Sequence, residues 1–387
     1  MRRVPSLYVF VAIVAVVVAL GCGQQALEKA AGQQQAAAQA SPAPENAAAF
    51  QVDASWPKEL PNKWLMGQVI GVAVDSRDHI WVLHRPRTLT KSEQGAALNP
   101  PTSDCCVPAP AVIEFDQQGS IVQAWGGPGA GYDWPAGEHG IFVDYKDFVW
   151  IGGNDAKDAQ VLKFTRDGKF IMQIGQGGKT GGSNDTKLLG RPADIAVDPE
   201  TNEVFVADGY GNRRVIVFDA DTGAYKRHWG AYGKTPTDQK LEPYKPEVTS
   251  PIFGDTVHCV RIANDGMVYV CDRSNHRIQV FKKDGTFVKE GFAGRTLAGA
   301  SVWDVDFSRD AAQSIIYNPD GGNHRVWALR RDSLETVGSF GRRGRNAGLF
   351  ESPHSIAVDS KGNIYVTETL DGRRVQRFVP KGRTSSD

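Results

Sequence analysis

The sequence has no excess of charge of either sign, because 44 lysines and arginines balance 44 aspartates and glutamates over 387 residues. A chain without a net electrostatic field has no general attraction for nucleic acid or for an anionic surface. We therefore expect no nucleic-acid partner.

Helical periodicity is also missing from residue 50 onward. Short runs rich in Val, Ile, Tyr and Phe are instead separated by turn sequences such as Asn264-Asp-Gly266 and Lys361-Gly-Asn363. Such runs, divided by Gly and Asn turns, are typical of antiparallel hairpins. The body of the chain is therefore predicted to be all-β.

Cysteine is scarce, with five residues in the whole chain. Cys259 and Cys271 are equidistant from Asp265, so a hairpin centred there would place them opposite each other. A cross-strand disulfide and a pair of buried thiols both remain open for them. The adjacent Cys105 and Cys106 form either a vicinal disulfide or a solvent-facing pair.

The first 22 residues predict export. A basic start precedes an apolar run from Tyr8 to Leu20, which is short for a membrane-spanning helix. Ala19-Leu-Gly-Cys22 then resembles a bacterial lipoprotein cleavage box, in which the thiol of Cys22 would receive the lipid. This predicts a lipid-anchored protein of the bacterial cell envelope, periplasmic or at the cell surface. An ordinary cleaved signal and an uncleaved anchor are the alternatives.

Residues 23–49 are rich in Gln, Ala and Pro, with almost no large apolar side chains. Such a segment cannot bury enough surface to offset its ordering entropy, and it predicts a disordered linker. Residues 50–382 are predicted to form a single domain.

Six copies of one motif organise this domain. Each is a β-type run of six residues, and the copies begin at Ile70, His139, Ala193, His258, Trp303 and His354. Successive copies are 69, 54, 65, 45 and 51 residues apart. The shorter spacings match a four-stranded propeller blade, and the longer ones contain insertions at Pro86–Ala111 and Gly230–Phe253.

We therefore predict a six-bladed β-propeller, closed by a strand near Phe50–Val52 that pairs with the last blade. A solenoid is the alternative, but the sequence shows no capping repeats.

Three of the six copies begin with histidine, and they alternate along the chain. In a closed ring, His139, His258 and His354 would face one another across the central channel. Three neutral imidazoles with an open fourth position are the ligand set of a catalytic Zn²⁺ ion. These residues are the predicted metal ligands; the alternative is three channel histidines bonded to water or backbone.

Asn275-His-Arg-Ile278 and Asn323-His-Arg-Val326 carry the signature of the NHL repeat, so residues 65–380 resemble NHL propellers. That family includes binding modules and enzymes. Within it, the chain is similar to the peptidyl-α-hydroxyglycine α-amidating lyases, also called peptidylamidoglycolate lyases. The resemblance implies a zinc-dependent carbon–nitrogen lyase that cleaves a carbinolamide into an amide and glyoxylate. The substrate would be a small or peptide-derived molecule.

The resemblance also implies roles for individual residues. The zinc-binding contexts match His139-Gly-Ile141, Val257-His-Cys259 and Pro353-His-Ser355. The pair His84-Arg85 places Arg85 to bind the substrate carboxylate. Asp208-Gly-Tyr-Gly-Asn212 carries the catalytic tyrosine over as Tyr210, and Cys271-Asp-Arg-Ser-Asn275 places a second active-site arginine at Arg273.

A calcium ion bound by backbone carbonyls near Val72 and Ile141 is a further implication of the resemblance. Ser355 stands where the family has a calcium-ligating Asp, so we expect this ion to be weakly bound or absent.

The alternative function is a non-catalytic NHL propeller that binds a protein or glycan as a cell-envelope scaffold. A calcium-dependent hydrolase is disfavoured, because the motif starts lack the carboxylates that such chemistry needs.

Overall fold

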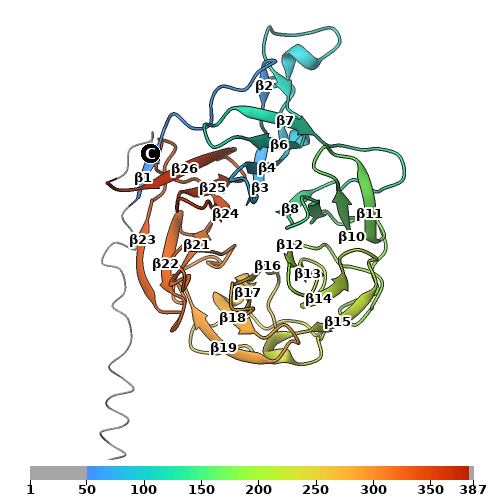
Figure 1. Cartoon of the computed structure of the whole chain (residues 1–387), viewed down its shortest axis with the longest axis vertical. Coiled ribbons are helices and arrows are strands. Elements are labelled where there is room, and N and C mark those ends of the chain that lie inside the picture. The colour runs from blue at the N-terminus through green and yellow to red at the C-terminus, as the bar shows by residue number, and fades with distance from the viewer. Residues whose placement is uncertain (1–49, 383–387) are drawn as a thin grey trace, which may run out of the picture. The chain divides into compact units, whose positions relative to one another are not determined.

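The computed structural model describes residues 50–382, which form six four-stranded antiparallel sheets arranged in a ring (Figure 1). The all-β, six-bladed propeller predicted from the motif copies is therefore confirmed. The predicted signal peptide, Cys22 and the linker 23–49 lie outside the described residues.

Each sheet is one blade. Blade 1 contains β3 (Gln68–Val74), β4 (Ile80–Arg85), β6 (Val112–Phe115) and β7 (Ile121–Trp125), and blade 2 contains β8 (Glu138–Val143), β9 (Val149–Gly153), β10 (Gln160–Phe164) and β11 (Phe170–Gly175). Blade 3 contains β12 (Asp194–Asp198), β13 (Glu203–Asp208), β14 (Arg214–Asp219) and β15 (Tyr225–Trp229), and blade 4 contains β16 (Val257–Ile262), β17 (Val268–Asp272), β18 (Arg277–Phe281) and β19 (Phe287–Phe292). Blade 5 contains β20 (Asp306–Phe307), β21 (Ile315–Asp320), β22 (Arg325–Arg330) and β23 (Thr336–Phe340), and blade 6 contains β24 (Pro353–Val358), β25 (Ile364–Glu368), β26 (Arg374–Pro380) and β1 (Phe50–Asp53).

The six motif copies coincide with the first strand of each blade, which is the strand nearest the centre of the ring (Figure 1). The copy at Trp303 is the weakest, since only Asp306 and Phe307 form a strand. Here the carboxylates of Asp304 and Asp306 accept the backbone N–H groups of Val305 and Phe307 at 2.8 and 2.7 Å. Such local bonds compete with the ladder of a sheet.

The ring closes where the two ends of the described chain meet. Strand β1 pairs antiparallel with β26, with Phe50 opposite Pro380 and Asp53 opposite Arg377. The guanidinium of Arg377 forms a buried ion pair with Asp53 across this pair of strands. The predicted closing strand is therefore confirmed: β1 covers the edge of β26 and becomes the outer strand of blade 6.

The hydrophobic core consists of six clusters, and each fills the seam between two neighbouring blades. Trp150 and Ile195 meet in the seam of blades 2 and 3, and Phe205 and Val257 meet in that of blades 3 and 4. The inner strands are consequently buried on both faces, which explains their nearly continuous apolar runs. This packing holds the inner strands side by side around the channel.

Buried ion pairs explain the arginine of the repeat signature. Arg277 of the signature begins the third strand of its blade, and in three blades the arginine at this place binds the acidic residue that ends the second strand, in the pairs Arg214–Asp208, Arg277–Asp272 and Arg374–Glu368. A buried charge needs such a partner, because removing it from water is otherwise costly. In blade 5, Trp327 takes over this role and donates its Nε1–H to Asp320 at 2.8 Å.

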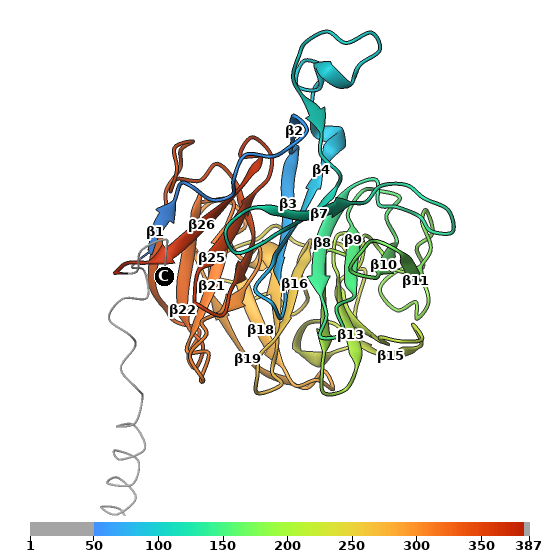
Figure 2. The same cartoon turned by 45° about the horizontal axis from the view of Figure 1, so that its top comes forward.

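Both predicted insertions leave the propeller as loops. The first holds the turns η2 (Pro86–Thr88) and η3 (Gly95–Ala97), and its β5 (Val107–Pro108) pairs in parallel with β2 (Trp64–Leu65). It projects from the edge of the ring (Figure 2) and carries a disulfide between Cys105 and Cys106. The second contains η4 (Ala231–Gly233). None of the helical turns in residues 50–382 is long and apolar enough to cross a membrane.

Candidate metal centre

The three predicted metal ligands converge in the channel. His139, His258 and His354 lie near the starts of β8, β16 and β24, in blades 2, 4 and 6, and all three are buried. Their ring centroids are 4.8, 4.8 and 4.9 Å apart, which is close to an equilateral triangle. One potential ligand atom from each residue lies within 4.8 Å of the others.

The other three motif copies orient these rings. Each histidine places its Nδ1 against the backbone carbonyl of the first residue of another motif copy: His139 against Ala193, His354 against Ile70, and His258 against Trp303. A carbonyl can only accept, so Nδ1 carries the proton in all three rings. Nε2 then carries the lone pair in each ring, which is the form in which a histidine binds a metal ion, and the backbone carbonyls fix the orientation of the rings.

The electrostatic environment keeps the imidazoles neutral. Burial, followed by the nearby Arg85, lowers the pKa of His354 to about 3. Burial also holds the pKa of His139 and of His258 well below the usual value, with His354 and Arg273, respectively, as the next causes. The space among the rings has a volume of about 10 Å³, roughly that of one water-sized sphere. The three histidines therefore form a site that could bind a single metal ion.

Tyr210 stands against this site. Its hydroxyl oxygen lies 3.0 Å from Nε2 of His139 and 3.1 Å from Nε2 of His258. The tyrosine sits in the loop after β13, next to Gly209, where an added Cβ would come within 2.0 Å of the carbonyl oxygen of Val257. The glycine thus permits the close approach of this loop to β16, which brings the phenol to the histidines.

Arg273 lies beside Tyr210, in the turn η5 (Arg273–Asn275) after β17. Its Nη1 donates to the hydroxyl of Tyr210 at 3.1 Å, and its guanidinium lies 4.9 Å from the ring centroid of Trp303. Its Nε is buried and makes no hydrogen bond within residues 50–382. A buried donor of this kind is suited to a ligand that carries an acceptor.

A disulfide anchors the two strands behind these groups. Cys259 and Cys271 are paired across β16 and β17, with Cα atoms 4.8 Å apart, and they are bonded to each other. Cys259 follows His258 directly, and Cys271 lies two residues before Arg273. Of the two alternatives left open by the sequence, the disulfide is the one found.

Arg85 ends β4, on the rim of the same site. Its Nε donates to the carbonyl of Glu138 at 2.8 Å, and its Nη2 donates to Oδ1 of Asn154 at 2.7 Å. Its neighbour His84 is fully buried, accepts the N–H of Gly67 at Nδ1 and donates from Nε2 to the carbonyl of Pro110. Nη1 of Arg85 also donates to Oε1 of Gln68 at 3.4 Å, so the chain's own acceptors hold this guanidinium on the rim of the site, whereas His84 is structural.

Two residues near the site were not singled out as functional from the sequence. The guanidinium of Arg191 lies 5.5 Å from the ring centroid of Tyr210, and that of Arg273 lies 5.3 Å from the same centroid. Trp303 packs against His258 and His354, with ring centroids 5.7 and 5.4 Å away. Trp303 begins a motif copy and so could have been expected in the channel; nothing in the local sequence marks Arg191.

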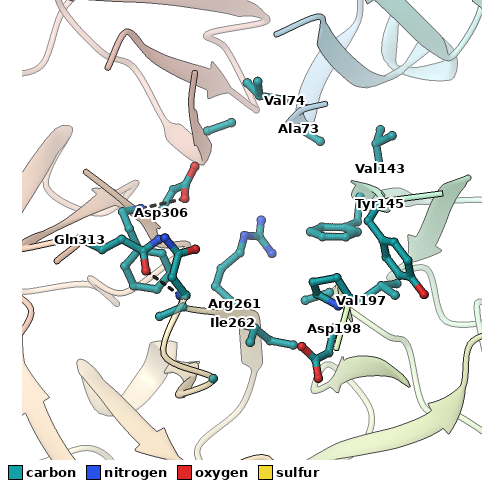
Figure 3. Close-up of a pocket in the computed structure, with 18 of the residues that line it drawn as sticks. Ala73, Val74, Val143, Tyr145, Val197, Asp198, Arg261, Ile262, Asp306 and Gln313 are labelled. Carbon is teal, nitrogen blue, oxygen red and sulfur yellow. Dashed lines mark hydrogen bonds between the residues drawn. The ribbon is translucent and has the colours of Figure 1, made fainter. Parts of the chain in front are cut away.

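The other end of the channel opens into a cavity of about 670 Å³ lined by the later residues of the inner strands. Figure 3 shows Arg261 reaching into its centre, with Asp306 and Asp198 at its margins. Arg261 is buried and binds Asp194 and Asp304, which border the small space next to the histidines. The two ends of the channel are thus separated by charged side chains.

Comparison with known proteins agrees with this architecture. The NHL repeat model matches residues 189–218 and 256–281. The chain is 27% identical to human NHL repeat-containing protein 3, over 86% of this chain and 84% of that protein. It is 28% identical to peptidyl-alpha-hydroxyglycine alpha-amidating lyase 1 of Drosophila melanogaster, over 64% of this chain but only 46% of the fly protein.

A solved structure supports the fold alone. A structural genomics protein of unknown function from Bacteroides thetaiotaomicron superimposes with a TM-score of 0.50 at 14% identity, covering 81% of this chain and 70% of that one. Taken together, the chain is an NHL-repeat six-bladed propeller. It is distantly related to the amidating lyases and to NHL repeat-containing protein 3.

Proposed function

We propose that this protein is a zinc-dependent lyase that cleaves the C–N bond of a carbinolamide and releases an amide and glyoxylate. The observation that carries the proposal is the set of three inward-facing imidazoles with the hydroxyl of Tyr210 against two of them. Neutral imidazole nitrogens suit Zn²⁺, and three protein ligands leave a position for substrate. The distant relationship to an amidating lyase supports the same reaction.

The proposed mechanism assigns one task to each group of the chain. Zinc bound by the three histidines would supply Lewis-acid chemistry that acidifies the substrate hydroxyl. Tyr210, as its phenolate, takes the hydroxyl proton. The C–N bond then breaks, the hydroxyl-bearing carbon becomes the aldehyde of glyoxylate, and the same proton passes to the amide nitrogen. The planar guanidinium groups of Arg85 and Arg273 suit the carboxylate of the substrate.

The decisive experiment compares metal content and activity in one variant. His258→Ala should lose about one equivalent of zinc per chain and the lyase activity on a peptidyl-α-hydroxyglycine, because two imidazoles no longer complete the site. His228→Ala, which alters a histidine on the outer strand β15, is the matched control and should keep both. Unchanged zinc and activity in His258→Ala would exclude the lyase.

The scaffold function is retained as a second candidate on one observation. The chain spans 84% of NHL repeat-containing protein 3, whose name specifies repeats and no reaction. A purified protein that contains no stoichiometric metal and does not turn over carbinolamides would favour a non-catalytic propeller that binds a protein partner.

We also propose that Cys22 anchors the propeller by lipid in the bacterial cell envelope. Cys22→Ser should then move the protein from the membrane fraction to the soluble fraction. An unchanged distribution would contradict lipid anchoring at this residue.

A further inference from the structure

The residues around the expected calcium position do not fit that ion. Ser355 supplies no charge there; its hydroxyl donates to Oδ2 of Asp304 at 2.8 Å and accepts the N–H of Val72 at 3.3 Å. Calcium prefers several oxygen ligands that include carboxylates. The carboxylates in this part of the channel belong to Asp194 and Asp304, and both are bound to a side chain of the protein itself.

That side chain is Arg261, on the inner strand β16. Its Nη1 donates to Oδ2 of Asp194 and, at 2.9 Å, to the carbonyl of Val260, while its Nη2 lies 3.2 Å from the carboxylate of Asp304. The guanidinium and both carboxylates are buried. Arg261 lines the same cavity as Val72 and Ile141, whose carbonyls were expected to bind the calcium ion.

The two carboxylates also join neighbouring blades. Oδ2 of Asp194, in blade 3, accepts the N–H of Val260 in blade 4 at 3.1 Å. Oδ2 of Asp304, at the start of blade 5, accepts the N–H of Ile356 in blade 6 at 3.1 Å. Val260 and Ile356 each lie two residues after a histidine of the metal centre, so these bonds fix the strands that carry His258 and His354.

We propose that the guanidinium of Arg261 is the resident cation of this channel, that it takes the place of a calcium ion, and that it braces the metal-binding strands through Asp194 and Asp304. A fixed positive charge held by two carboxylates needs no ion from solution. The inference goes beyond the lyase reaction, because it concerns how the site is held and does not depend on the substrate.

Calcium titration of the purified zinc-loaded protein tests whether Arg261 takes the place of a calcium ion. The wild-type chain should show no binding heat and no rise in melting temperature at millimolar calcium. The double variant Arg261→Ala/Ser355→Asp removes the guanidinium and restores the carboxylate, so its melting temperature should rise with calcium. Stoichiometric calcium binding by the wild-type chain would overturn the proposal, whatever the outcome of the activity assays.

The bracing role is tested by Arg261→Met, which keeps much of the volume and removes the charge. Leaving two buried carboxylates without their cation should lower the melting temperature by about 5 °C or more. Zinc should also dissociate at least about tenfold faster. Arg261→Lys retains the positive charge but loses the planar set of donors. Its melting temperature and its rate of zinc loss should lie between those of the wild type and of Arg261→Met. This variant provides the measurement if Arg261→Met does not fold. Wild-type stability and zinc retention in either variant would refute the bracing.

Discussion

The hydroxyl oxygen of Tyr210 lies 3.0 Å from Nε2 of His139, so the phenol occupies the space beside the atom that a metal ion would bind. A group in this place can exchange a proton with a substrate held at the same centre. Tyr210 is not one of the three predicted metal ligands, which are all histidines.

Tyr210→Phe should therefore separate catalysis from metal binding. The loss of a positioned proton-transfer group is expected to reduce kcat by about 10²- to 10⁴-fold. Zinc content, measured by elemental analysis, should stay unchanged because all three histidines remain. Tyr225→Phe, which removes an exposed phenol bonded to His228, is the control and should behave as the wild type. A fully active Tyr210→Phe variant would remove the tyrosine from the mechanism.

Arg85 is expected to act on substrate binding. Arg85→Lys keeps the positive charge but loses the planar pair of donors, so KM for a carboxylate substrate should rise about tenfold or more with a smaller change in kcat. A substrate analogue with a carboxamide in place of the carboxylate should already bind weakly to the wild type. The variant should then show little further loss with that analogue. Equal losses on both substrates would mean that Arg85 acts through the fold.

His84 predicts a loss of stability in acid. Its burial lowers its pKa to about 4, whereas an unfolded histidine titrates near 6.5. Between these values the unfolded chain binds more protons, so the stabilisation is complete above pH 6.5 and decreases as the pH falls toward 4. At pH 4.5 the loss should amount to roughly 2–3 kcal/mol.

Urea unfolding of the wild type and of His84→Gln at pH 7 and pH 4.5 measures the contribution of His84 to the free energy of unfolding. The variant should be less stable at pH 7, because Gly67 and Pro110 lose their partner, but it should lose less on acidification. Parallel losses in the two proteins would contradict a neutral His84.

The two disulfides should differ in their contribution to stability. The bond between Cys259 and Cys271 closes a loop with a sequence separation of 12 and lies in the buried core. Its removal in Cys259→Ala/Cys271→Ala should cost about 3 kcal/mol of unfolding free energy. Cys105→Ala/Cys106→Ala is the matched control, because adjacent residues enclose almost no loop. Denaturant melts that rank the two double variants the other way would refute this.

The propeller was predictable because its signals are local. In the sequence, each inner strand is marked by a β-type run of six residues and a following turn, and the six copies together predict the ring. The histidines alternate among these copies, so their convergence follows from closure alone. The assignments of Arg85, Tyr210 and Arg273 came from the family resemblance; the structure places Arg273 and Tyr210 within hydrogen-bonding distance of each other.

The charged network below the histidines was not predicted, because it depends on contacts between blades. Asp194 and Asp304 occupy the second position of two motif copies that lack histidine, and this regularity was visible in the sequence. The cation that binds these two carboxylates could not be predicted, since Arg261 lies in the motif copy that begins at His258 and contacts them only in the folded ring. The contact between Arg191 and Tyr210 was not predicted either, because it joins two separate loops.

The pairing of β1 with β26 ties the candidate metal centre to both ends of the described residues. The third imidazole, His354, belongs to the blade whose outer strand comes from residues 50–53, more than 300 residues earlier. During synthesis, the first two ligands can be present long before this last sheet is assembled. Binding of a metal ion by all three imidazoles would therefore require the final blade, and a chain that ended before β26 would carry every candidate ligand but lack the sheet that holds the third.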